Sequence, residues 1–151
     1  MAQAEEAPAE LKVSSPNGDH TISFTLVEGV PSYRVTYKDT VILSDSRLSL
    51  TLDGDDLIGN FQVERSTTDS KRGSWTPVVG SKSSYPDAYE ERTVRLRETT
   101  GAKRRLDLVF RAYNEGVAFR YAIPAQAALH DFTIRSENSE FQFTGDHHVY
   151  W

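Results

Sequence analysis

The sequence predicts an all-β domain built as an antiparallel β-sandwich. Apolar residues alternate with polar residues along almost the whole chain, and this period of two is typical of half-buried strands. Clusters of Gly, Asn, Asp and Pro, which favour turns, interrupt these runs at short intervals. No helix of normal length is predicted. The runs amount to about ten short strands, at the spacing expected of a sandwich or a barrel.

The first half of the chain is predicted to form hairpins. Residues 11–14 and 21–26 should pair, because the Pro-Asn-Gly-Asp sequence at 16–19 between them is typical of a turn. Residues 33–38 alternate as a third strand, and residues 41–43 follow after a further turn.

The middle of the chain is less regular. Leucines at 48, 50 and 52 alternate and lead to the acidic turn 53–56, after which residues 61–63 resume the pattern. Residues 66–86 are polar and predict either a long excursion around a sheet edge or a ragged strand. Trp75 lies there, and we expect it to close one end of the sandwich, because large aromatic side chains are buried on average. The alternative is that Trp75, Tyr85 and Tyr89 lie on loops and stack on sugars.

Residues 93–123 predict a three-stranded meander with turns at 99–102 and 114–116, and Pro124 ends its last strand. Arg111 and Arg120 should face away from the core or form ion pairs. The residues expected to be mainly buried repeat at period two on facing strands: Leu108, Phe110, Val117, Phe119 and Tyr121.

The two ends of the chain carry weaker signals. Residues 125–129 could form one helical turn, while 132–134 and 141–143 each predict a further strand. Residues 11–151 are assigned to one domain. Residues 1–10 are assigned to a flexible segment, which is either a frayed end or the start of an exported protein with a Met added.

Composition excludes several classes of function. The net charge of −5 argues against nucleic acid, since its binding proteins are usually basic. The chain has no Cys, which rules out disulfides, thiolate metal sites and a Cys nucleophile. No run approaches the ~20 apolar residues that a membrane span needs.

No residue is assigned a catalytic, cofactor-binding or metal-binding role. The turn 53–56 has carboxylates for calcium but lacks the ligand spacing of an EF-hand, so we favour a solvated turn. His147 and His148 are adjacent and would point to opposite faces of a strand, which disfavours one shared zinc ion. The basic meander contains interspersed acidic residues, which predicts an ion-paired face.

Several strings resemble the N-terminal domain of glycoside hydrolase family 97. The most specific is LDLVFRAYNEGVAFRY at 106–121, and YRVTYK at 33–38 and WTPVVG at 75–80 occur in the same order. The resemblance starts near Leu11 and continues to the end of the chain. The chain departs from the family pattern at Val79 and Ser81, where Trp and Glu are common, and at 47–49, where a Leu-Gly-Leu string is usual.

The resemblance implies the supersandwich-like N-terminal domain of a secreted or periplasmic bacterial α-glucosidase or α-galactosidase. In that family the domain packs on a catalytic (β/α)8 barrel, which carries most catalytic carboxylates beside a calcium ion. We therefore expect this chain to be non-catalytic, to lack part of its sandwich and to help close the pocket for an oligosaccharide substrate. The glutamate that such a domain donates near the calcium is expected beyond residue 151.

Two other functions remain open, a stand-alone carbohydrate-binding module and a protein-interaction β-sandwich. A binding module should cluster aromatic residues on one face, whereas a scaffold should expose an apolar patch where its barrel docks. We expect that patch to border residues 124–151, with Val149, Tyr150 or Trp151 exposed and with self-association in solution.

Overall fold

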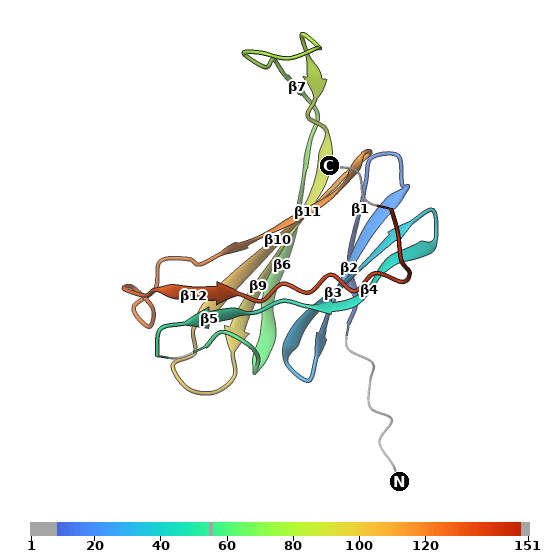
Figure 1. The fold of residues 1–151 in the computed structure, drawn as a ribbon. Coiled ribbons are helices and arrows are strands. Elements are labelled where there is room, and N and C mark those ends of the chain that lie inside the picture. The colour runs from blue at the N-terminus through green and yellow to red at the C-terminus, as the bar shows by residue number, and fades with distance from the viewer. Residues whose placement is uncertain (1–8, 55, 149–151) are drawn as a thin grey trace.

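The fold consists of two four-stranded antiparallel sheets and two short strand pairs (Figure 1). The structure is a computed structural model, and it describes residues 9–54 and 56–148. Most of residues 1–10, and Val149, Tyr150 and Trp151, lie outside the described residues, so the predictions made for them remain predictions. No helix, and therefore none able to cross a membrane, occurs in the described ranges. The predicted all-β class is confirmed.

The strands have the following bounds. The first sheet contains, in spatial order, β1 (Leu11–Ser14), β2 (His20–Val27), β3 (Val30–Tyr37) and β4 (Thr40–Arg47). The second contains, in spatial order, β11 (Gly116–Ala122), β10 (Arg105–Tyr113), β9 (Tyr89–Glu98) and β6 (Phe61–Lys71). The short pairs are β5 (Leu50–Leu52) with β12 (Ile134–Glu137), and β7 (Ser74–Trp75) with β8 (Tyr85–Pro86).

The first hairpin forms as its turn residues predict. Gly18 has a φ of 79° and donates its N–H to the carbonyl of Ser15 at 2.8 Å. The Asn17 side chain accepts the N–H of Asp19 at 3.0 Å, which is the local bond that makes Asn favourable in turns. β1 and β2 then pair with Val13 opposite Ile22.

The meander has the predicted register, but its last strand is less buried than expected. Phe110 lies opposite Phe119 and is 1% exposed, whereas Val117, Phe119 and Tyr121 are only half-buried. These three side chains pack against the core but keep part of their surface in water, because β11 is the outer strand of its sheet and has a neighbour on one side only among the described residues.

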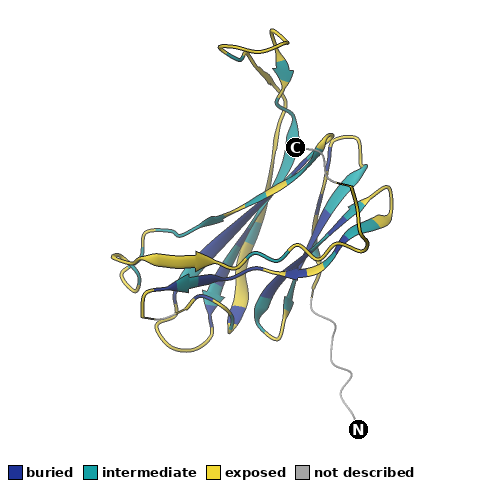
Figure 2. Ribbon diagram, in the orientation of Figure 1, coloured by how far each residue is buried: buried dark blue, intermediate teal, exposed yellow. Residues whose placement is uncertain are grey.

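The core lies between the two sheets, where the dark-blue segments of Figure 2 face one another. Phe24 of β2 meets Phe110 of β10, with ring centroids 5.8 Å apart. Ile22 beside Phe24 and Leu108 beside Phe110 are also fully buried. Burial of each such side chain contributes about 1.5–3 kcal/mol.

Residues 138–148 run along the outer edge of β4 and form no regular strand, contrary to the prediction for 141–143. Leu43 and Phe143 form a single bridge, and the N–H of Ser44 bonds the Gln142 carbonyl at 2.8 Å. The Ser46 hydroxyl accepts the N–H of Gln142 at 3.0 Å. Side chains therefore satisfy backbone groups that a continuous ladder would otherwise pair.

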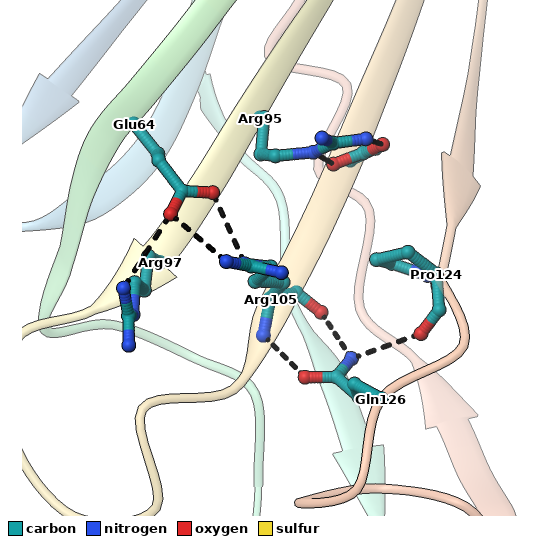
Figure 3. Close-up of polar contacts among 7 residues, drawn as sticks. Glu64, Arg95, Arg97, Arg105, Pro124 and Gln126 are labelled. Carbon is teal, nitrogen blue, oxygen red and sulfur yellow. Dashed lines mark hydrogen bonds and ion pairs between the residues drawn. The ribbon is translucent and has the colours of Figure 1, made fainter.

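The predicted helical turn at 125–129 is a β-turn. Leu129 donates its N–H to the carbonyl of Gln126 at 3.3 Å. The Gln126 side-chain amide bonds both backbone groups of Arg105, at 2.7 and 2.8 Å (Figure 3). This side chain pairs with the start of β10 as a strand residue would, and it fixes the turn in place.

A buried ion pair closes one end of the second sheet. The Arg104 guanidinium bonds both oxygens of Glu98, at 2.6 and 2.9 Å, and its Nη2 also donates to the carbonyl of Asp56 at 3.0 Å. Burial raises the pKa of the Glu98 carboxyl, but the bonds from Arg104 outweigh it, so the pKa lies below its ordinary value. The pair therefore joins the loop after β5 to the turn between β9 and β10.

Arg104→Met should destabilise the fold by about 3–5 kcal/mol at pH 7, because it leaves the Glu98 carboxylate buried without its cation. The pKa of Glu98 is lowered in the folded state, so the stabilisation is present above the ordinary carboxyl pKa and is lost as the pH falls through the lowered one. Urea unfolding at several pH values should therefore show that the difference in unfolding free energy between the unchanged chain and Arg104→Met becomes smaller at acidic pH. The control Arg97→Met removes a more exposed ion pair, worth about 1 kcal/mol or less. Equal losses in the two variants would contradict the prediction.

Candidate functional site

The acidic turn at 53–56 is occupied by contacts within the protein. Asp53 pairs with Arg135 at 2.6 Å, and the Asp56 carboxylate accepts the N–H of Leu52 at 3.1 Å. Asp55 lies outside the described residues. Within residues 9–54 and 56–148 there is no group of three or more His, Cys, Asp or Glu that could hold a metal. The carboxylates of Asp53 and Asp56 therefore both have partners within the protein.

The histidines at 147 and 148 are both exposed. The His147 ring contacts the Phe143 ring edge-on, with centroids 6.1 Å apart.

A polar depression of about 730 Å³ lies between the loop after β5 and the turn after β9. Its walls include the Glu98–Arg104 pair and the Asp53–Arg135 pair. Each of these four charges has an opposite charge beside it. These four charges are therefore already paired within the protein.

The outer face of the second sheet carries the ion pairs that the sequence predicted. Glu64 lies between Arg97 and Arg105, at 3.5 and 3.1 Å, and Arg95 makes a two-point contact with Asp107 at 2.9 and 3.0 Å (Figure 3). Opposite charges on neighbouring strands reduce the net charge of this face.

The sequence made a prediction for Arg111, which lies on β10, and for Arg120, which lies on β11. Arg111 pairs with Glu91 at 2.6 Å, and Arg120 is exposed on β11. Both outcomes agree with the sequence prediction.

An apolar seam lies where β11 approaches β12. It encloses a hollow of about 470 Å³, with apolar walls and two charged residues at its rim. Ile134 is 50% exposed and Phe141, close by, is 55% exposed. We define the seam by five residues: Phe119, Tyr121, Ile123, Ile134 and Phe141.

The seam is continuous with the core through a series of aromatic rings. Phe119 lies 6.5 Å from Phe110 on the inner side and 6.0 Å from Phe141 on the outer side, measured between centroids. Tyr33 contacts Phe119 at 5.2 Å and donates its hydroxyl to the carbonyl of Glu140 at 2.8 Å. The Tyr121 hydroxyl bonds the Ser139 hydroxyl at 2.9 Å. The sheets thus leave uncovered a surface with the composition of a core.

A two-stranded arm, residues 72–88, extends away from the sandwich with β7 and β8 in it (Figure 1). Trp75 lies on this arm and is 53% exposed, so the expectation that it closes the end of the sandwich was wrong. Its ring stacks on Tyr85, with centroids 5.2 Å apart and planes 19° apart. Val78 and Val79 at the tip are fully or almost fully exposed. The polar sequence of 66–86 gave no sign that two strands would continue beyond the sheet.

Charged contacts brace the base of the arm. Lys71 pairs with Asp87, Arg72 pairs with Glu90, and the Arg72 guanidinium also donates to the carbonyl of Tyr89 at 3.1 Å. Tyr89 itself belongs to the sandwich, where it packs on Tyr113. The arm is therefore held at its base on both strands.

Comparison with known proteins agrees with this architecture. The family model described as "Glycosyl-hydrolase 97 N-terminal" matches residues 13–151. The chain belongs to this family. The sequence resemblance is thereby confirmed over almost the whole described range. Val79 and Ser81, two of its departures from the family pattern, lie in the exposed tip of the arm.

Solved structures of glycoside hydrolase family 97 share the fold. Enzymes of this family from Pseudoalteromonas sp. strain K8, in complex with panose or with acarbose, match at a TM-score of 0.83 and 25% identity, over 89% of this chain and 20% of theirs. A beta-arabinopyranosidase matches at a TM-score of 0.80 and 24% identity, over 88% of this chain and 21% of its own. The chain thus spans about a fifth of the length of these proteins.

Tyr121 of the seam and Tyr33, which contacts the seam through Phe119, should make stability depend on pH in the alkaline range. Burial raises the pKa of both Tyr33 and Tyr121 to about 12. Above pH ~10 the unfolded chain releases phenol protons that the folded chain retains, so stability should fall as the pH rises from about 10 to 12. Urea midpoints across this range should show a shallower fall in Tyr33→Phe/Tyr121→Phe than in the unchanged chain. The control Tyr37→Phe, at a more exposed position, should follow the unchanged chain. If the urea midpoint of the double variant fell with pH as steeply as that of the unchanged chain, Tyr33 and Tyr121 would not be the cause of the alkaline loss of stability.

Proposed function

We propose that this chain is the non-catalytic scaffold domain of a family 97 α-glycosidase and that its seam packs against the catalytic barrel. The apolar seam is the observation that carries the proposal. Contiguous apolar surface is rare on an isolated domain and usually marks a contact with another domain or molecule. Glycoside hydrolase relatives about five times as long as the matched region are consistent with a further domain that could cover the seam.

The rest of the proposed enzyme supplies the chemistry. A catalytic barrel hydrolyses α-glucosides or α-galactosides, and this domain helps to close the oligosaccharide pocket. We place the calcium of the whole enzyme in its catalytic barrel, as the family resemblance implies. A periplasmic or secreted location in a bacterium accompanies this proposal.

A stand-alone carbohydrate-binding module is the second candidate. The exposed ring of Trp75, stacked on Tyr85, favours it, because aromatic side chains combine an apolar face with a polar edge. A protein-interaction sandwich would use the same seam for a separate partner. The self-association test below separates a scaffold from an autonomous carbohydrate-binding module, whereas the hydrolysis test checks that the chain is non-catalytic.

The chain on its own should not hydrolyse aryl α-glucosides or α-galactosides, with or without calcium. The proposal places the general acid in the catalytic barrel, and this chain spans about a fifth of the length of its family 97 relatives. Release of the aryl group should equal a no-protein control. Turnover above that control, abolished by substituting one carboxylate of this chain, would overturn the proposal.

The seam should also make the isolated chain self-associate. Ile134→Asp places a charge in the seam and should shift the chain towards monomer in sedimentation velocity. Val27→Asp is the matched control, since Val27 is 49% exposed against 50% for Ile134 and lies at the end of β2. A clean monomer of the unchanged chain at high concentration, or the same shift in both variants, would favour an autonomous module.

A further inference from the structure

We propose that Trp75 and Tyr85 form a platform on which a pyranose ring of an oligosaccharide stacks. The choice of sugar as the ligand rests on the proposed function, whereas the platform itself is a feature of the arm. Neither the apolar seam nor the ion-paired face includes these two residues. Packing in the buried core does not explain why these two aromatic residues are present, because both lie on the arm.

The exposure of Trp75 requires an explanation. Tryptophan is highly buried on average, and leaving about half of its surface in water forgoes hydrophobic stabilisation. Here the indole is exposed although it sits in a regular strand pair, directly opposite Tyr85. Its exposure therefore follows from the position of the arm and not from local disorder of the backbone.

The pair is organised before any ligand arrives. Stacking at 5.2 Å with planes 19° apart fixes the tilt of the indole, and the Lys82 ammonium lies 5.8 Å from the centroid of the Tyr85 ring. The pairs of Lys71 with Asp87 and Arg72 with Glu90 hold the base of the arm. A rigid aromatic surface loses little conformational entropy on binding.

The chemistry around the platform fits an amphipathic ring. A pyranose has one face of C–H groups, which an aromatic ring can cover, and a rim of hydroxyls that need hydrogen-bond partners. The exposed residues next to the pair supply such partners from hydroxyl and ammonium groups: Thr76, Ser81, Lys82, Ser83 and Ser84. A protein partner would need about 800 Å² from each side, and a narrow arm with polar flanks offers little of that area.

Intrinsic fluorescence can test the platform directly, because the chain has two tryptophans, Trp75 and Trp151. In Trp151→Phe the emission reports Trp75 alone. Titration with maltotriose should give a saturable change with a dissociation constant on the order of 1 mM, as expected of one stacking contact with few polar bonds. Tyr85→Leu in this background should weaken binding at least several-fold. The control Tyr37→Leu, which removes a ring on the first sheet, should leave it unchanged.

A second measurement covers the case in which a variant fails to fold. In the unchanged chain, the indole N–H resonance of Trp75 should shift with maltotriose in a ¹H–¹⁵N spectrum and saturate over the same concentrations. No saturable change in either measurement, with the native spectrum retained, would overturn the platform. Equal loss of binding in Tyr85→Leu and Tyr37→Leu would also overturn it.

The arm as a protein contact is a further possible outcome. Suppose that Val78→Asp abolished self-association, and that maltotriose changed neither the fluorescence nor the indole N–H resonance. The arm would then be a docking element, and the platform would be overturned. The test is independent of the scaffold proposal, since that proposal depends on Ile134→Asp and the seam. Saturable maltotriose binding without any effect of Ile134→Asp would support the platform and remove support from the scaffold.

Discussion

Phe24 of β2 and Phe110 of β10 meet between the two sheets, and the faces of the molecule follow from their contact. Because side chains alternate along a strand, a buried Phe110 also places Leu108 and Leu106 inside, and it places Arg111 and Asp107 on the outer face. A shift by one residue would bury the charged set. The same register brings Phe119 of β11 to the margin of the core, where the seam begins.

The two surfaces proposed to act lie in different parts of the molecule and have different chemistry. The seam is an uncovered margin of the core, linked to it through Phe110 and Phe119, and it suits a broad, dry contact. The arm carries a narrow aromatic surface with polar neighbours, and it suits a small amphipathic ligand. A domain placed beside a catalytic pocket would use the seam to hold its position and the aromatic surface of the arm to contact a ligand that enters the pocket.

The regular parts of the fold could be predicted from the sequence because their signals are local. The hairpin turn at 16–19 and the alternation of 93–123 each specify strand pairs close in sequence. The half-burial of Phe119 and the exposure of Trp75 could not be predicted, since both depend on where a sheet ends. The side chains of Gln126 and Ser46 bond backbone groups that a neighbouring strand would otherwise pair. These bonds could not be predicted either, because hydrogen bonds between distant segments produce no periodic pattern in the sequence.

The arm continues two strands of the second sheet, with Lys71 opposite Tyr89 at its base and Trp75 opposite Tyr85 further out. One residue added to each strand would lengthen it by about 3.3 Å and turn the aromatic pair to the opposite side. Two added to each would extend it by about 7 Å and restore the side. The reach of the pair can therefore change in steps of two residues per strand while the sandwich stays the same. Homologues could in this way adjust how far the domain extends over a pocket without any change in its core.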